Sequence, residues 1–338
     1  MKKIVSFFTW LSILAFFAST TLAADAKAPF FDGKTFRIIV SASPGGGYDA
    51  YARLFARHMK EHLPGEQEII VQNMPGGGGI RAANYLSKVA DPDGLTWAHL
   101  SRGVYLSQFT GQAGVEFDIT KFIPLGSATF ENQVVFVRSD LLPGSLQKLT
   151  EASAGEKKIF VGSTGLGSST FVLWKTLEAL VPELKYEFVS GYPGSTEIHL
   201  ALRQGEVNAY AQSESSFLLQ AKELLKTGKI AVIAQIGTSE RKRDSDFPDA
   251  PTFWELVDSK KDKSLVSVAA ASSFGGRPFF LPPGVPSGRV EVLRSSFVSA
   301  AKDPDLLAEA EKLKRPVDPV PGPVLEEIYR DVFDASPE

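Results

Sequence analysis

Two turns rich in glycine and hydroxyl side chains carry the residues best suited to chemistry. The first, residues 41–49 (SASPGGGYD), follows the apolar run 36–40, and the second, residues 162–169 (GSTGLGSS), follows the apolar run 159–161. A helix that begins at such a turn leaves backbone N–H groups unpaired, and the positive end of its dipole lies there too. Each turn therefore predicts an anion site. The second turn adds four hydroxyl donors suited to a carboxylate, namely Ser163, Thr164, Ser168 and Ser169.

The first turn has two competing interpretations. The segment Gly45-Gly46-Gly47-Tyr48-Asp49-Ala50 fits the dinucleotide pattern G-x-G-x-x-A. That pattern also needs an acidic residue at the end of the next strand, but the predicted strand ends in Gln72-Asn73. A plain tight turn without a ligand is the other alternative. We therefore favour the anion site over both of these alternatives.

Residue patterns that would indicate catalysis or a metal are missing. The chain has no cysteine, no H-E-x-x-H and no G-x-S-x-G, and neither glycine turn ends in G-K-[ST]. Of its four histidines only His58 and His62 share a predicted helix face, where they could hold a metal or face solvent. We predict no catalytic residue, no metal and no cofactor, and hence a protein that is not an enzyme.

The first residues are typical of a secretory signal peptide. Lys2 and Lys3 precede the uncharged apolar stretch 4–18, and Thr21-Leu22-Ala23 offers small residues for cleavage. A retained anchor is the alternative, although the apolar stretch is shorter than the ~20 residues that a membrane span needs. Cleavage after residue 23 would remove two lysines and change the net charge from −3 to −5. This prediction gives an exported, soluble, mildly acidic protein without the basic surface of a nucleic-acid binder.

Strand and helix patterns alternate along the chain. Strands are predicted at residues 36–40, 68–72, 95–100, 133–137, 158–161, 207–211 and 230–236, and helices at 49–62, 80–90, 170–180, 196–204 and 216–226. Such alternation indicates an α/β protein with mostly parallel sheets covered on both faces. The length favours two lobes. The Pro/Gly-rich stretches 275–288 and 315–323 are predicted to cross the surface.

Six segments resemble one family. PGGGYDAYARLFARHM, VQNMPGGGGIRAANYL, DPDGLTW, GSTGLGSS, SGYPGSTEIHLALRQGEVNAY and FFLPPGVPSGRVEVL follow, in this order, the pattern of tripartite tricarboxylate transporter substrate-binding proteins, the Bug family. The resemblance implies a periplasmic protein with two doubly wound α/β lobes that bind a small organic carboxylate in the cleft. It further implies delivery to a membrane permease with one large and one small subunit. The ligand contacts it implies are Pro44, Gly45, Gly46, Gly47, Tyr48, Asp49, Ser163, Thr164, Gly165, Gly167, Ser168 and Ser169.

Departures from the family pattern concern the ligand. Arg102, after Ser101, and Arg277 stand where the family is uncharged, so each is a candidate for a second carboxylate, with an ion pair as the alternative. Phe171 stands where the family often has histidine. In the segment Gln212-Ser213-Glu214, Ser213 is a candidate contact, whereas Glu214 in the cleft would disfavour an anion unless it faced a cation.

These inferences combine into one expected architecture. Lobe one is expected to comprise residues 33–131 plus 266–338, and lobe two residues 132–265, in a monomer. Gly46 and Gly47 are expected to let the backbone approach a carboxylate, with positive φ as a possible reason, and Asp49 to cap the first helix. Two other functions stay open: a receptor that reports the same ligand to a membrane sensor, and a secreted hydrolase of carboxylate esters.

Overall fold

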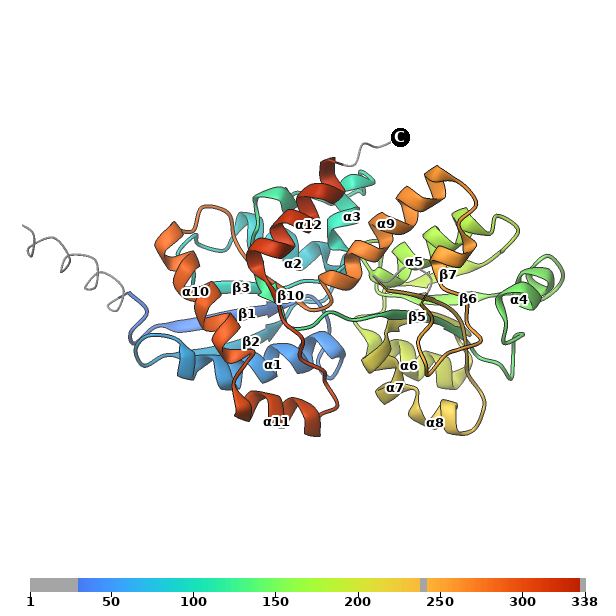
Figure 1. Ribbon diagram of the computed structural model, residues 1–338, viewed down its shortest axis with the longest axis horizontal. Coiled ribbons are helices and arrows are strands. Elements are labelled where there is room, and N and C mark those ends of the chain that lie inside the picture. Colours follow the sequence, from blue (N-terminus) through green and yellow to red (C-terminus); the bar gives the residue numbers. More distant parts are fainter. Residues whose placement is uncertain (1–29, 238–241, 335–338) are drawn as a thin grey trace, which may run out of the picture.

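The chain folds into two α/β lobes, each built on one sheet. The computed structural model describes residues 30–237 and 242–334, so the predicted signal peptide lies outside it (Figure 1). The first sheet has the order β11-β4-β10-β3-β1-β2 and the second β7-β6-β8-β5-β9. The strands are β1 Thr35–Val40, β2 Glu68–Asn73, β3 Thr96–His99, β4 Ile123–Ser127, β5 Gln133–Val137, β6 Phe160–Ser163, β7 Glu187–Ser190, β8 Ala209–Ser213, β9 Ala231–Ile236, β10 Pro278–Leu281 and β11 Val320–Pro321.

Helices cover both faces of the first sheet. Phe36, Ile38 and Val40 of β1 pack on one side with α1, α10 and α11, whereas Ile39 packs on the other with α2, α3 and α12. This alternation follows from the two-residue period of a strand. The helices of this lobe are α1 Gly47–Met59, α2 Ile80–Lys88, α3 Val104–Phe109, α10 Ser287–Ala300, α11 Pro304–Lys312 and α12 Gly322–Asp334.

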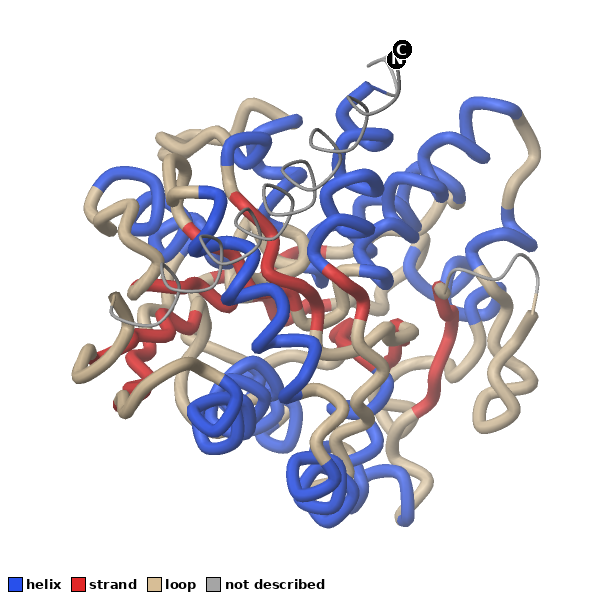
Figure 2. Tube along the Cα trace, turned by 60° about the vertical axis from the view of Figure 1, so that its left-hand side comes forward, coloured by secondary structure: helices blue, strands red, loops and turns tan. Residues whose placement is uncertain are grey.

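The second sheet is covered in the same way. Val135 and Val137 of β5 pack with α4, α5 and α9, and Val134 and Phe136 pack with α6 and α7. In both views the strands lie inside and the helices outside (Figure 2). The helices are α4 Leu146–Ser153, α5 Ser169–Leu180, α6 Ser195–Gln204, α7 Glu214–Gln220, α8 Lys222–Lys226 and α9 Lys260–Phe274. The α/β class expected from the alternating pattern is confirmed.

Both sheets are mixed, which corrects the expectation of mostly parallel strands. β1 runs parallel to β2 and β3, and β6 runs parallel to β7 and β8. In contrast, β10 is antiparallel to β3 and β4, β11 to β4, and β5 to β8 and β9. The prediction that residues 275–288 cross the surface was also wrong. β10 lies within that stretch, and it is a fully buried strand between two neighbours.

The segments that cross between the lobes lie side by side. Glu131 N–H donates to Ser273 C=O (3.2 Å), and Ala128 N–H donates to Arg277 C=O (3.0 Å). Helix α9 packs on α5 of the second lobe and on α12 of the first. Among the described residues, no helix has both the length and the apolar composition needed to cross a membrane.

Candidate functional site

A small cavity of about 60 Å³ lies between the lobes. Ten residues predicted from the sequence line it: Gly46, Gly47, Tyr48, Ser101, Arg102, Thr164, Ser168, Ser169, Ser213 and Arg277. The other six predicted residues are not in its wall: Pro44, Gly45, Asp49, Ser163, Gly165 and Gly167. Further wall residues escaped the prediction: Ser41, Ala42, Gly78, Thr170, Gly194, Ser195, Tyr210, Gln212 and Ser216. Both glycine turns therefore meet at one cavity.

Three helices begin at this cavity. Helix α1 starts at Gly47, α5 at Ser169 and α6 at Ser195, and each of these residues lines the wall. The first N–H groups of a helix have no partner within it, and its dipole is positive at that end. The cavity thus receives backbone donors and positive potential from both lobes. This arrangement favours an anion.

At Gly46 and Gly47, glycine is needed because of space, and not because of backbone conformation. Gly46 has a φ of −81°, whereas the positive φ (+83°) belongs to Gly45. A Cβ on Gly47 would lie 2.6 Å from Ser216 Oγ and 2.8 Å from Arg277 Nη2. The expectation of positive φ at Gly46 and Gly47 was wrong. What the turn requires is close approach of α1 to the side chains behind it.

Asp49 holds the first turn together from outside the cavity. Its carboxylate accepts from the N–H of Gly45 (2.9 Å) and from Asn73 Nδ2 (3.0 Å), and it pairs with Arg53 (3.0 Å). Burial raises the pKa of Asp49, but the hydrogen bonds from Arg53 and Gly45 outweigh it and lower the pKa overall. The bond to Gly45 reaches back to a residue before the helix. The prediction that Asp49 accepts from the first N–H groups of the helix was therefore wrong.

The hydroxyls of the second turn divide into two roles. Ser168 Oγ accepts from Phe171 N–H (3.2 Å) and so caps α5, and it lies 3.0 Å from Ser163 Oγ. Ser163 Oγ in turn accepts from Gly165 N–H (3.1 Å). These two hydroxyls shape the turn. Thr164 and Ser169 line the cavity. Within the described part of the chain, their hydroxyls form no hydrogen bond with another residue.

A buried cluster of charges forms one wall. Arg102 Nη2 lies 3.3 Å and Arg277 Nη2 3.2 Å from the same oxygen, Oε2 of Glu131. All three side chains are at most 4% exposed. Both arginines line the cavity. The two alternatives given for them, a place in the cavity and an ion pair, therefore hold together. One carboxylate cannot neutralise two guanidinium groups, and the wall keeps a net positive charge.

Arg277 and Tyr48 connect this cluster to both lobes. Arg277 Nη2 donates to Ser213 Oγ (2.6 Å) and Ser216 Oγ (3.0 Å), and the guanidinium lies 4.9 Å from the ring centre of Tyr48. The Tyr48 hydroxyl accepts from Arg102 N–H (2.9 Å), which leaves its proton free to donate. Burial raises the pKa of Tyr48, but the charges of Arg102 and Arg277 outweigh burial and lower it. Tyr48 therefore serves both as a donor and as a ring wall.

The lobes also touch directly around the cavity. Gly78 N–H donates to Thr164 C=O (3.0 Å), Ser101 Oγ donates to Gly167 C=O (3.2 Å), and Ser43 Oγ donates to Glu197 Oε2 (2.8 Å). A Cβ on Gly78, whose φ is +68°, would lie 2.5 Å from the backbone nitrogen of Ser168. Close approach of main chains from the two lobes therefore depends on glycine here.

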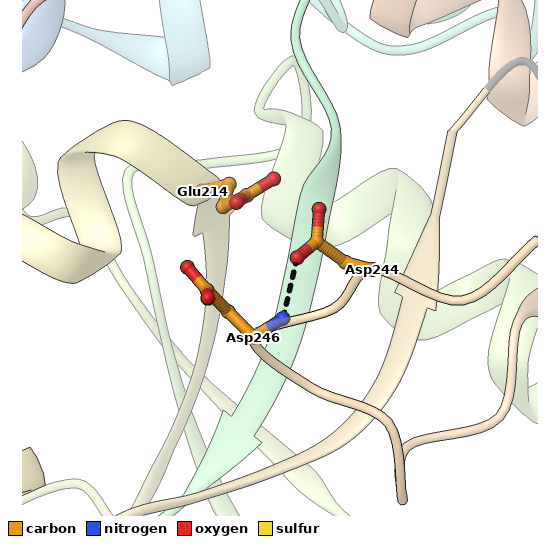
Figure 3. A group of neighbouring side chains, drawn as sticks. All are labelled: Glu214, Asp244 and Asp246. Carbon is orange, nitrogen blue, oxygen red and sulfur yellow. Dashed lines mark hydrogen bonds between the residues drawn. The ribbon is translucent and has the colours of Figure 1, made fainter.

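Glu214 lies away from the cavity, so it does not oppose an anion there. Oxygens of Glu214, Asp244 and Asp246 all lie within 4.8 Å of one another, and Asp246 N–H donates to Asp244 (2.8 Å) (Figure 3). Burial and the neighbouring charges of Asp244, Glu131 and Asp246 raise the pKa of Glu214 to about 7. Glu214 instead lines a second hollow, together with residues of α7, α8 and α11.

The histidine pair considered for a metal is engaged elsewhere. His58 Nε2 lies 2.7 Å from Glu309, and His62 Nε2 lies 2.6 Å from Asp303, so both rings contact carboxylates at or next to α11. Within the described ranges, no histidine lines the cavity. The wall offers hydroxyls, backbone N–H groups and guanidinium groups, all of which can donate hydrogen bonds to an anion.

Two α/β lobes that enclose a polar cavity between them have the architecture of periplasmic binding proteins. The profile of the tripartite tricarboxylate transporter family receptor (TctC) matches residues 51–320. The chain belongs to this family. A UPF0065 protein of Bordetella pertussis is 28% identical over 307 residues, covering 88% of this chain and 85% of the relative.

Solved structures agree on the fold. The periplasmic binding protein BugD superposes with a TM-score of 0.69 at 19% identity, covering 89% of this chain and 95% of BugD. MatC from Rhodopseudomonas palustris, solved with bound malate, gives a TM-score of 0.68 at 23% identity, covering 90% of this chain and 97% of MatC.

Proposed function

We propose that the protein is a periplasmic receptor that captures a small organic carboxylate between its lobes and delivers it to a membrane permease of one large and one small subunit. The observation that carries the proposal is the buried positive wall of Arg102 and Arg277, which share Glu131 and face the starts of α1, α5 and α6. Membership of the receptor family and malate in the related MatC support it.

The proposal assigns a role to each part of the wall. One carboxylate of the ligand accepts from backbone N–H groups at Gly47 and Ser169, one from each lobe. A second carboxylate meets Arg102 and Arg277, where a charged hydrogen bond contributes about 1.5–3 kcal/mol. Because the donors come from both lobes, the ligand binds best when the lobes meet, and it shifts a hinge equilibrium toward that arrangement.

The proposal includes the organisation expected from the sequence. Residues 1–23 act as a cleaved signal peptide, lobe one comprises residues 33–131 plus 266–338, and lobe two residues 132–265. The mature protein acts as a monomer and uses no cofactor. A sensing receptor would use the same cavity and differ only in its membrane partner. A hydrolase would need a base near a serine, and no described histidine lines the cavity.

Calorimetry with a series of four- to six-carbon dicarboxylates, malate included, tests the proposal. We expect at least one of them to bind the wild-type protein. Gly47→Ala should abolish binding, because its Cβ would enter the space of Arg277 and Ser216. Gly288→Ala is the matched control, since nothing lies within 4 Å of its Cβ. A folded protein that binds no dicarboxylate, or a Gly47→Ala variant that binds normally, would contradict the proposal.

A further inference from the structure

A second, larger hollow lies between the lobes on the side of α7, α8 and α11. It has a volume of about 740 Å³, and its wall contains Leu218 and Leu219 of α7 and Leu307 of α11. These leucines are 36%, 39% and 40% exposed, so together they form an exposed apolar patch in one groove. We call this hollow the α7–α11 groove. Such a groove offers apolar contact to a molecule that enters it.

The wall of the α7–α11 groove also holds a buried cation. Arg315 is only 4% exposed, and its Nη1 donates to Ser216 Oγ (3.1 Å). Among the described residues, no carboxylate forms an ion pair with Arg315. Burial and the charge of Arg277 lower the pKa of Arg315 by more than the neighbouring Tyr51 and Glu131 raise it. A buried guanidinium without a carboxylate partner is costly, and an anion would offset that cost.

The charges nearby do not supply this anion. Glu131 lines the groove and its charge raises the pKa of Arg315, but its carboxylate is already shared by Arg102 and Arg277. Glu214, in the same wall, lies with Asp244 and Asp246 (Figure 3), and neither Glu214 nor Glu311 is among the groups that shift the pKa of Arg315. The remaining charges in the wall are cations, Lys222 and Lys314.

A polar group in the wall of the same groove is also without a partner. Ser215 Oγ is a buried atom with no hydrogen bond, and Ser215 lines the groove. We propose that the α7–α11 groove is a second ligand site, which binds an amphiphilic monocarboxylate. Its carboxylate pairs with Arg315 and accepts from Ser215, and its hydrocarbon body packs on Leu218, Leu219 and Leu307.

This site is separate from the cavity of the proposed function but adjoins it. Ser216 Oγ accepts from Arg277, which faces the cavity, and from Arg315, which faces the groove. The walls of the groove come from both lobes, because α7 belongs to the second and α11 to the first. An occupant of the groove would therefore contact both lobes at once.

The probe for the test is octanoate, with octanamide as its uncharged analogue, titrated into the mature protein. We expect octanoate to bind and octanamide to bind at least about tenfold more weakly, because the amide cannot pair with Arg315. Leu307→Glu should weaken octanoate binding at least about tenfold, because it places a carboxylate in the apolar wall. Leu313→Glu is the matched control, since Leu313 is equally exposed but lies outside the groove.

Methyl signals of leucine in ¹H–¹³C spectra show where octanoate binds. We expect shifts at Leu218, Leu219 and Leu307. Absence of octanoate binding, equal affinity in wild type and Leu307→Glu, or equal affinity for octanamide would each overturn the inference. These outcomes do not depend on the dicarboxylate titrations, so failure at the cavity and failure at the groove are distinguishable. Arg315→Met is a further variant if it folds, and it should also lose octanoate binding.

Discussion

The carboxylate of Glu131 lies 3.2 Å from the guanidinium of Arg277, and both side chains are almost fully buried where the chain crosses between the lobes. This pair ties the segment that leaves the first lobe to the segment that returns to it. It also fixes Arg277 in the cavity wall. The same contact therefore supports the fold and orients a cation toward the ligand space.

Glu131→Gln should lower the free energy of unfolding by about 3–5 kcal/mol, because Arg102 and Arg277 would lose their buried counter-charge. Burial raises the pKa of Glu131, but the two arginines outweigh it, so the pKa lies below its usual 4.5. A lowered pKa gives stability that is present above pH 4.5 and is lost as the pH falls through the folded-state pKa. Denaturant unfolding at pH 7 measures the effect, with the exposed Glu116→Gln as control. An unchanged midpoint would contradict it.

Glu214→Gln should stabilise the protein at pH 8 and hardly at pH 5. The pKa of Glu214 is raised to about 7, so ionisation costs stability as the pH rises from 4.5 to above 7. The gain at pH 8 should be about 1–3 kcal/mol. Thermal unfolding at both pH values measures it, with the exposed Glu183→Gln as control. Equal effects at pH 5 and pH 8 would show that the acidic cluster carries no such penalty.

Gly78→Ala and Gly111→Ala separate backbone strain from contact between the lobes. Both glycines have positive φ (+68° and +59°), so alanine costs roughly 1–2 kcal/mol of stability at either site. Only at Gly78 would the Cβ collide with the other lobe; nothing lies near Gly111. We expect Gly78→Ala to weaken carboxylate binding at least about tenfold and to enlarge the ligand-bound radius of gyration in small-angle scattering. Gly111→Ala should bind like the wild type, and equal binding by both variants would sink the idea.

We expect Ser168→Ala to change mainly stability and Ser169→Ala to change mainly ligand binding. Ser168 caps α5, so its alanine variant should lose about 1 kcal/mol of stability. Ser169 lines the cavity, so its alanine variant should keep its stability and bind the carboxylate about tenfold more weakly. Calorimetry and thermal unfolding on the same samples measure both effects. A Ser169→Ala variant with wild-type affinity would show that the second turn supports binding only through its backbone.

The fold was predictable where local pattern determines structure. Every strand predicted from an apolar run is present, and the glycine turns begin α1 and α5 as expected. β10 was missed because Pro278 and the flanking glycines indicate a loop, yet tertiary contacts bury the segment between β3 and β4. The region 216–226 was predicted as one helix but forms two, α7 and α8.

The site was predictable in part, for the same reason. The glycine and serine content of the turns indicates a binding site. Tyr210 and Gln212, in contrast, lie on β8, and nothing in the local sequence indicates that they line a cavity. Gly194 and Ser195 begin α6, and the run PGSTE could have indicated this third helix start. The shared Glu131 was not predictable, since its partners Arg102 and Arg277 are 29 and 146 positions away.

The hydrogen bonds of Gly78, Ser101 and Ser43 to the opposite lobe have a consequence for transport under the proposed function. They supply part of the free energy of closure from the protein itself, so some receptors should close with no cargo. Such molecules would present the same outer shape to the permease as loaded ones and would occupy its docking site unproductively. Uptake should therefore pass through an optimum in the amount of receptor and decline when receptor greatly exceeds its carboxylate.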